Sequence, residues 1–154
     1  FLKIALCTGA RSGSILRIHR DDIRDDGRVI LFNEKTDQQY IGFLDMETLE
    51  LVRNKKGYIL ARRGEENAPA KRYGICSTIQ LMMDKLFNPP GTRDLDRVVI
   101  HTLRHSVATQ MVNKGVPIEI ISKTLDHASL QTTVKFYAKI SPEMVRESVS
   151  NIWE

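Results

Sequence analysis

The densest group of side chains that could take part in chemistry is formed by His101, Arg104 and His105. Spacings of three and four residues place these side chains near one another on a helix. Two imidazoles and a guanidinium together favour an anion such as a phosphate group. Alternatively, they are a surface arginine and two histidines that only form hydrogen bonds within the protein. A zinc site fits less well, because the metalloprotease motif requires Glu directly after the first His, where this chain has Thr102.

A second group of polar and aromatic residues lies nearer the C-terminus. Asp126 and His127 precede the pair Thr132-Thr133, and Tyr137 follows them. This order places His127 and Tyr137 at opposite ends of a short helix. On these residues alone, Tyr137 is interpreted as an aromatic side chain of the core, which is the commoner role of a tyrosine on an apolar helical face.

The order and spacing of both groups resemble the signature of tyrosine recombinases and phage integrases. The residues that carry this resemblance are His101-x-x-Arg104-His105, Leu125-x-His127, Thr132-Thr133 and Tyr137. Upstream, the segment 8–11 (Thr-Gly-Ala-Arg) is similar to the family's first-arginine motif, in which a turn containing glycine presents the arginine, here Arg11. The segment 33–36 (Asn-Glu-Lys-Thr) resembles the family's mobile β-turn, whose lysine, here Lys35, reaches the scissile site.

The resemblance implies that Tyr137 is the nucleophile of a site-specific recombinase. Its hydroxyl would attack a DNA phosphodiester and form a 3′-phosphotyrosine, which conserves the bond energy so that a free 5′ hydroxyl of another strand can rejoin without ATP. Arg11 and Arg104 would hold the charge of the pentavalent transition state with their planar guanidinium groups. Because two arginines can replace a metal here, the implied reaction needs no metal and no other cofactor.

The remaining candidate residues follow from the same resemblance. His101 and His127 would donate hydrogen bonds to the phosphate, and either could remove the proton from Tyr137. Lys35 would protonate the departing 5′ oxygen as a general acid; otherwise it is a solvated lysine of a loop. His105 is expected to support the site from outside rather than to act in the chemistry.

Several positions depart from the family's pattern, among them the strand at 40–44 (Tyr-Ile-Gly-Phe-Leu), which stands in place of the usual Arg-x-Val-Pro-Leu. Ser14 stands where the family usually has Glu, Asp126 replaces the usual Gly, and Phe136 occupies the position where many members have the nucleophile. A catalytically decayed integrase that binds DNA without cleaving it is therefore one alternative. Another is a helix-turn-helix DNA-binding regulator, since residues 115–137 predict two short helices joined by a turn. Such a regulator would need neither the first arginine nor the loop lysine, and the chain contains both.

The elements that must position these residues are predicted to be mostly helices. Turn signals and β-forming residues indicate one antiparallel hairpin with strands at 28–32 and 40–44 and a loop at 33–39. Apolar periodicity and capping residues predict helices at 1–7, from about 15, at 45–52 with Asp45 as N-cap, from Ser77 to about 88, at 101–114 ending at Gly115, from Pro117, at 129–137 and from Ser141. The fold class is therefore α+β, a mainly helical domain with a small antiparallel β-sheet, which the resemblance identifies as the tyrosine recombinase catalytic fold.

Composition limits the class of protein only loosely. The chain has 154 residues, of which 42% are hydrophobic, so one compact domain is expected. Its net charge of +4 suits a polyanion but is also common in ordinary proteins. Cys7 and Cys76 are expected to be buried free thiols, which fits a reducing, cytoplasmic setting. No apolar run approaches the roughly 20 residues that span a bilayer, so no membrane partner is expected.

The chain starts with Phe1 rather than Met. We expect residues 1–154 to be the C-terminal catalytic domain of a longer recombinase, with an upstream DNA-binding domain outside this sequence. The resemblance implies double-stranded DNA as the partner and a homo-tetramer on paired DNA sites. The C-terminal helix predicted from Ser141 would be exchanged between protomers; packing on its own domain is the alternative.

Overall fold

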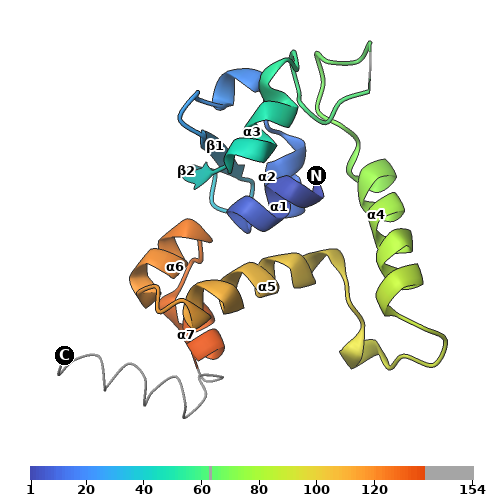
Figure 1. Ribbon diagram of the computed structural model, residues 1–154, viewed down its shortest axis with the longest axis vertical. Coiled ribbons are helices and arrows are strands. Elements are labelled where there is room, and N and C mark those ends of the chain that lie inside the picture. Colours follow the sequence, from blue (N-terminus) through green and yellow to red (C-terminus); the bar gives the residue numbers. More distant parts are fainter. Residues whose placement is uncertain (63, 138–154) are drawn as a thin grey trace.

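In the computed structural model, residues 1–62 and 64–137 are described, residues 136 and 137 by their backbone alone (Figure 1). This part of the chain is mainly helical and contains one two-stranded antiparallel sheet, which confirms the α+β class. Its helices and strands are α1 (Leu2–Thr8), α2 (Ser12–Leu16), β1 (Arg28–Asn33), β2 (Gln38–Phe43), α3 (Met46–Arg53), α4 (Arg72–Phe87), α5 (Ile100–Asn113), α6 (Ile118–Thr124) and α7 (Leu130–Tyr137), with short 3₁₀ turns at Arg20–Asp22 and Asp94–Asp96.

The hairpin of β1 and β2 extends closer to its turn than the sequence predicts. Strand pairing continues to Asn33 opposite Gln38, so the turn comprises residues 34–37 and the prediction of a loop at 33–39 is wrong. Asparagine usually marks a turn, which is why β1 was expected to end one residue earlier. Here the side chain of Asn33 is buried, and its contacts inside the protein hold the strand together to this point.

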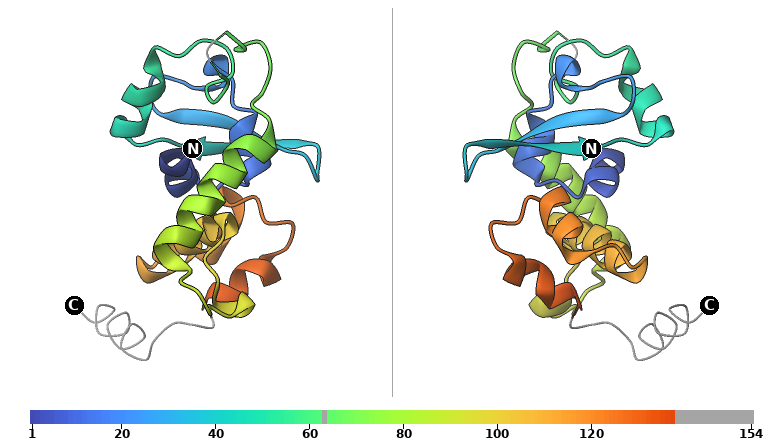
Figure 2. Two further views of the ribbon diagram at one scale, coloured as in Figure 1. Left: turned by 90° about the vertical axis from the view of Figure 1, so that its right-hand side faces the viewer. Right: turned by 90° about the vertical axis from the view of Figure 1, so that its left-hand side faces the viewer.

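Two groups of buried apolar side chains form the core. The larger one lies among α1, α2, the hairpin and α3, and its largest fully buried members are Ile15, Ile18, Leu31 and Leu49. The smaller one lies between α5 and α6 and consists of Ala108, Val112, Ile121 and Leu125. Figures 1 and 2 show the two resulting parts one above the other, with α4 running along one side of them. The protein is therefore built from an N-terminal and a C-terminal part that must meet accurately.

Local capping signals predict α3 correctly and α4 incorrectly. Asp45 caps α3, as predicted, by accepting a backbone N–H of its first turn at 2.7 Å. Helix α4, in contrast, begins at Arg72, so that Ser77 lies inside it. The Ser77 hydroxyl donates to the carbonyl of Tyr73, one turn back in the same helix. A serine that bonds to its own helix in this way has the same sequence signature as a cap.

The last three helices of the described residues begin within one residue of the predicted positions. Helix α5 ends just before Gly115, whose φ of 68° is left-handed. Pro117 is the N-cap of α6 rather than its first residue, and α7 begins at Leu130 rather than Ser129. The helix predicted from Ser141 lies outside the described residues.

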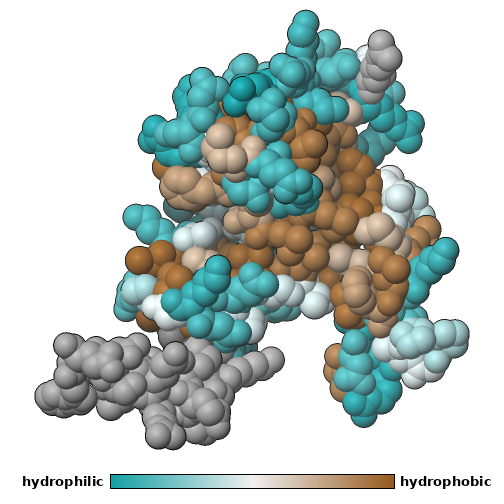
Figure 3. Space-filling view, viewed as in Figure 1, coloured by the Kyte–Doolittle hydropathy of each residue, from teal (hydrophilic) through white to brown (hydrophobic). Residues whose placement is uncertain are grey.

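The surface carries a broad apolar area on the face seen in Figure 3, where hydrophobic residues gather between the two parts and along α4. Exposed apolar side chains of α4 include Leu81, Leu86 and Phe87. Among the helices of residues 1–62 and 64–137, none is long and apolar enough to cross a membrane. Cys7 and Cys76 are free thiols, as predicted, but they are only partly buried.

Gly9 lies where the two parts meet. It ends α1 with a left-handed backbone (φ 61°), and its N–H donates to the Ala5 carbonyl at 2.9 Å. A Cβ at this position would overlap Leu125 Cδ2 and would lie 3.2 Å from Val107 Cγ1. Glycine is therefore required here both for its backbone conformation and for the space that the C-terminal part occupies.

We predict that Gly9→Ala lowers the free energy of unfolding by about 2–4 kcal/mol, the sum of left-handed strain and overpacking. Gly115→Ala is the matched control, because Gly115 is also left-handed but has no atom within 4 Å of the added Cβ. The control should lose only about 1–2 kcal/mol. Urea unfolding measures both values, and equal losses would contradict the close packing of Gly9 against Leu125.

Candidate active site

Arg104 is a buried cation that joins the two parts of the protein. It projects from α5 with only 5% of its surface exposed. One terminal nitrogen, Nη1, donates to the Gly9 carbonyl at 2.8 Å, and the other, Nη2, donates to the Leu125 carbonyl. Burial lowers the pKa of Arg104 to about 10, and the charge of Arg11 acts in the same direction. The guanidinium therefore stays charged at neutral pH.

Arg11 contacts the same loop from another segment of the chain. It precedes α2 and follows the turn at Gly9. Its Nη1 and Nη2 both lie 3.3 Å from the backbone carbonyl of Asp126, and Nη1 lies 3.4 Å from the Asp126 carboxylate oxygen Oδ2. Its side chain is 29% exposed. The two arginines predicted to hold a phosphate are thus brought to one loop, and Arg11 is open to solvent.

His127 follows this loop and is a neutral imidazole at neutral pH. Its Nδ1 lies 2.7 Å from the hydroxyl of Thr133, a fully buried residue in the first turn of α7. Burial lowers the pKa of His127 to about 4, and the charges of Arg104 and Arg11 add to this effect. Thr133 orients the ring, so that the neutral imidazole can offer a hydrogen bond without adding a positive charge, or can accept a proton and become charged.

His101 and His105 stack edge to face on α5, with ring centroids 4.7 Å apart. Burial lowers the pKa of His101, followed by the charges of His105, Arg104, Arg11 and Lys35. His101 is therefore also favoured in its neutral form. The contact with His105 fits the supporting role predicted for that residue, which stays a prediction.

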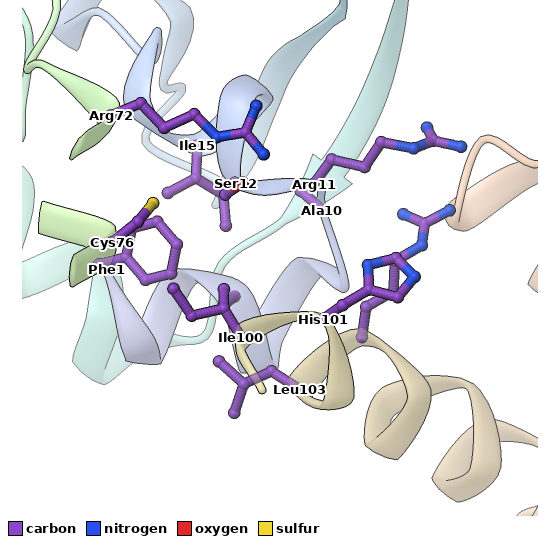
Figure 4. Close-up of a pocket in the computed structure, with 12 residues that line it drawn as sticks. Phe1, Ala10, Arg11, Ser12, Ile15, Arg72, Cys76, Ile100, His101 and Leu103 are labelled. Carbon is purple, nitrogen blue, oxygen red and sulfur yellow. The ribbon is translucent and has the colours of Figure 1, made fainter. Parts of the chain in front are cut away.

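A pocket beside the two arginines connects these groups (Figure 4). Arg11, His101 and Arg104 line it together with Arg72, the first residue of α4. Its apolar lining includes Phe1, Ala10, Ile15, Ile100 and Leu103. Sequence reasoning missed Arg72, because nothing distinguishes it from the other basic residues of the segment before α4. It adds a third guanidinium to the anion-binding character of the pocket.

Lys35 lies in the turn of the β-hairpin and is exposed. Its backbone N–H donates to Oδ1 of Asn33 at 3.0 Å, while Nδ2 of Asn33 donates to Oδ2 of Asp126. The turn that carries Lys35 is thus tied to the loop that contacts both arginines.

Comparison with known proteins identifies the family of this chain. Residues 1–144 match the model of the phage integrase family. The chain belongs to the phage integrase family. It is 27% identical over 135 residues to a probable integrase/recombinase protein of Methanocaldococcus jannaschii, covering 82% of this chain and 41% of that protein. It is 29% identical over 157 residues to the tyrosine recombinase XerD of Mycobacterium tuberculosis, covering 95% of this chain and 49% of that protein.

A solved structure shows that the fold of this phage integrase family member is shared at low sequence identity. The integrase of the transposon Tn1549, in complex with transposon right end DNA, is similar with a TM-score of 0.71 at 15% identity. The likeness covers 99% of this chain and 58% of that one. The chain spans about half the length of the curated relatives described above.

The structure brings most of the predicted site residues of this integrase-family chain to one region, but not all of them. Arg11 and Arg104 both contact the loop after α6, which carries His127, and His101 lines the adjoining pocket. The exposed Lys35 is linked to this loop through its turn. Tyr137 is the last residue of α7. Its backbone is described, but its side chain is not.

Asp126, which the sequence marked only as a departure from the family pattern, makes contacts at this loop that the sequence did not predict. It has a left-handed backbone with φ 50°, a conformation that suits the Gly expected at this position from the family resemblance. Asp is among the few other residues that adopt this conformation readily. The departure from the family pattern is therefore compatible with the fold, and the aspartate side chain adds contacts to Arg11 and Asn33. A search for left-handed positions after helices would have drawn attention to it.

Tyr40 of β2 faces the same region with a buried hydroxyl. Within the described part of the chain, this hydroxyl has no hydrogen-bond partner of good geometry. Burial raises the pKa of Tyr40, although the Ser14 hydroxyl and the charge of Arg104 oppose the shift. Ser14 itself is buried. A neutral hydroxyl thus stands beside the serine that replaces the family's usual glutamate.

The lowered pKa of His127 predicts a dependence of stability on pH. As pH falls below about 6.5, the unfolded chain binds a proton before the folded chain does, because the folded pKa is about 4. The free energy of unfolding should therefore decline between pH 6.5 and 4. His127→Asn should make this part of the profile flatter in urea unfolding measured across that range. Profiles of equal slope for the wild type and the variant would show that the pKa of His127 is not lowered.

For Tyr40→Phe we expect the free energy of unfolding to stay constant or rise by up to about 1 kcal/mol, because the buried hydroxyl that is removed has no partner of good geometry among the described residues. Ser14→Ala, measured alone and together with Tyr40→Phe, is the control for an interaction between the two hydroxyls. Non-additive effects, or a clear loss of stability in Tyr40→Phe, would contradict the absence of a partner.

Proposed function

We propose that residues 1–154 form the catalytic domain of a site-specific tyrosine recombinase that cleaves and rejoins DNA through a 3′-phosphotyrosine. The observation that carries this proposal is that Arg11 and Arg104, which come from two distant segments, both contact the loop that carries His127. Family membership over residues 1–144 supports it. A helix-turn-helix regulator would have no use for this convergence, and Ser14 and Asp126 remove none of the groups that take part in it.

In this proposal, Arg11 and Arg104 bind the scissile phosphate. The Arg104 guanidinium uses two of its five N–H groups on backbone carbonyls, and this anchoring fixes the direction of the others. Arg11 is held by longer contacts and is partly exposed, so it is suited to meet a phosphate from solvent. Charge that develops on the non-bridging oxygens would be stabilised by fixed cations, with no step that needs a metal.

In this proposal, the imidazoles and the lysine of the hairpin turn transfer the protons. His127 and His101, both favoured as neutral rings, can take the proton of Tyr137 as its oxygen forms the bond to phosphorus. As the bond from phosphorus to the 5′ oxygen breaks, the Lys35 ammonium would give that oxygen a proton. The reverse sequence, with a 5′ hydroxyl of another strand, would release Tyr137 and rejoin the DNA.

The assembly follows from the count of strands. Exchange between two duplexes requires four cleavages, and each chain supplies one candidate nucleophile, so we propose a homo-tetramer on paired sites. The C-terminal helix from Ser141, outside the described residues, is proposed to be exchanged between protomers.

Since the chain spans about half the length of its curated relatives, a further DNA-binding domain is proposed to precede it. The work of such an enzyme on DNA points to the cytoplasm.

The decisive test uses nicked duplex DNA that carries the recombination site and traps covalent adducts. With the intact protein, the wild type should form an adduct that survives denaturing electrophoresis, whereas Tyr137→Phe should bind the DNA but form none. Tyr58→Phe, which removes a tyrosine hydroxyl beside His19, is the matched control and should form the adduct. An adduct with Tyr137→Phe would exclude this nucleophile. A wild type that binds the site without any adduct would favour the decayed integrase or the regulator.

A further inference from the structure

Asp126 sits at the centre of a short chain of polar contacts. Its carboxylate oxygen Oδ2 accepts a hydrogen bond from Nδ2 of Asn33 and lies 3.4 Å from Nη1 of Arg11. Asn33 ends β1, Arg11 precedes α2, and Asp126 lies in the turn between α6 and α7. One carboxylate oxygen therefore joins three segments that are far apart in the sequence.

The contact with Asn33 leads directly to Lys35. While Nδ2 of Asn33 faces Asp126, Oδ1 of the same amide accepts the backbone N–H of Lys35 at 3.0 Å. Such a side-chain bond to the backbone two residues on fixes the start of a turn. Because Asn33 is only 2% exposed, its amide has little freedom to turn away. The orientation of the Lys35 backbone thus depends on where Asp126 holds Asn33.

The link to the hairpin is the contact that depends on the carboxylate itself. Toward Arg11, the carboxylate contact is long, and the Asp126 backbone carbonyl already lies 3.3 Å from both Nη atoms. That carbonyl would remain with any residue at the position. The Arg11 and Asp126 side chains are also 29% and 21% exposed, which weakens an ion pair by solvent screening. What the carboxylate alone provides is the hydrogen bond to Asn33.

We propose that Asp126 is a positioning residue that holds the Lys35 turn against the site through Asn33. The inference rests on the proposed function, since it assigns the partner through which Lys35 is presented to the departing oxygen. A glycine would adopt the same left-handed backbone with less strain, so the side chain at this position is explained by its contacts. The competing idea is that the carboxylate occupies Arg11 in place of the DNA phosphate and must be displaced.

The test compares two nicked DNA substrates, one ordinary and one with sulfur in place of the bridging 5′ oxygen at the scissile phosphate. A thiol is a much stronger acid than an alcohol, so a sulfur leaving group departs without a proton from Lys35. Single-turnover cleavage by the intact protein is measured for the wild type, Lys35→Ala, Asp126→Gly and Asp126→Asn. DNA affinity and urea unfolding are recorded for each.

Asp126→Gly should cleave the ordinary DNA about tenfold or more slowly than the wild type, a part of the total contribution of general acid catalysis. It should cleave the sulfur substrate at nearly the wild-type rate, as Lys35→Ala should. Asp126→Asn, which keeps an acceptor oxygen for Asn33 and tolerates the left-handed backbone, should retain more activity than Asp126→Gly on ordinary DNA. DNA affinity should stay the same in both Asp126 variants.

Two results would overturn the inference. Equal loss on both substrates would mean that Asp126 acts through Arg11 or through the fold. Tighter DNA binding or faster cleavage in Asp126→Gly would mean that the carboxylate competes with phosphate. Failure of the proposed function itself looks different, because the wild type would then form no adduct on either substrate.

Discussion

The interaction on which the rest of the structure depends is the buried guanidinium of Arg104 between two backbone carbonyls. Removing a charge from water is costly unless it gains hydrogen bonds of good geometry. Here one carbonyl comes from Gly9 in the N-terminal part and the other from Leu125 in the C-terminal part. The favourable position of the charge therefore exists only when the two parts have docked. A residue assigned to phosphate binding is at the same time the clamp that assembles its own site.

The two carbonyls that Arg104 uses are presented by left-handed turns. Gly9 has φ 61°, and Asp126, directly after Leu125, has φ 50°. Each of these residues follows the end of a short helix, α1 or α6, at a place where the backbone must leave the helical direction. Arg11 comes directly after the first turn region and His127 directly after the second. The backbone bends that aim the carbonyls at Arg104 therefore also deliver the other predicted site residues to the same place.

Features that depend on neighbouring residues could be predicted from the sequence, and those that depend on distant contacts could not. The Asp45 cap and the glycine that follows α5 are local signals, so α3 and the end of α5 were predictable. The order of Arg11, Arg104 and His127 identified a candidate site, although the residues alone gave no reason to expect Arg104 to be buried. The start of α4, the burial of Asn33 and the contacts of Asp126 depend on what lies across the fold, and no periodicity or spacing expresses that.

Electrostatics explains why neutral imidazoles suit a site that already holds two arginines. Arg104 keeps its charge although it is buried, and Arg11 lies across the same loop. A further cation among them would raise the energy of the site in the absence of DNA, and the lowered pKa values of His127 and His101 reflect burial first and then this repulsion. A phosphodiester held by the arginines would bring a negative charge that opposes the repulsion, so that a proton taken from the nucleophile becomes easier to hold. Under the proposed function, the substrate would itself adjust the basicity of the histidines, and DNA binding would be thermodynamically linked to their protonation.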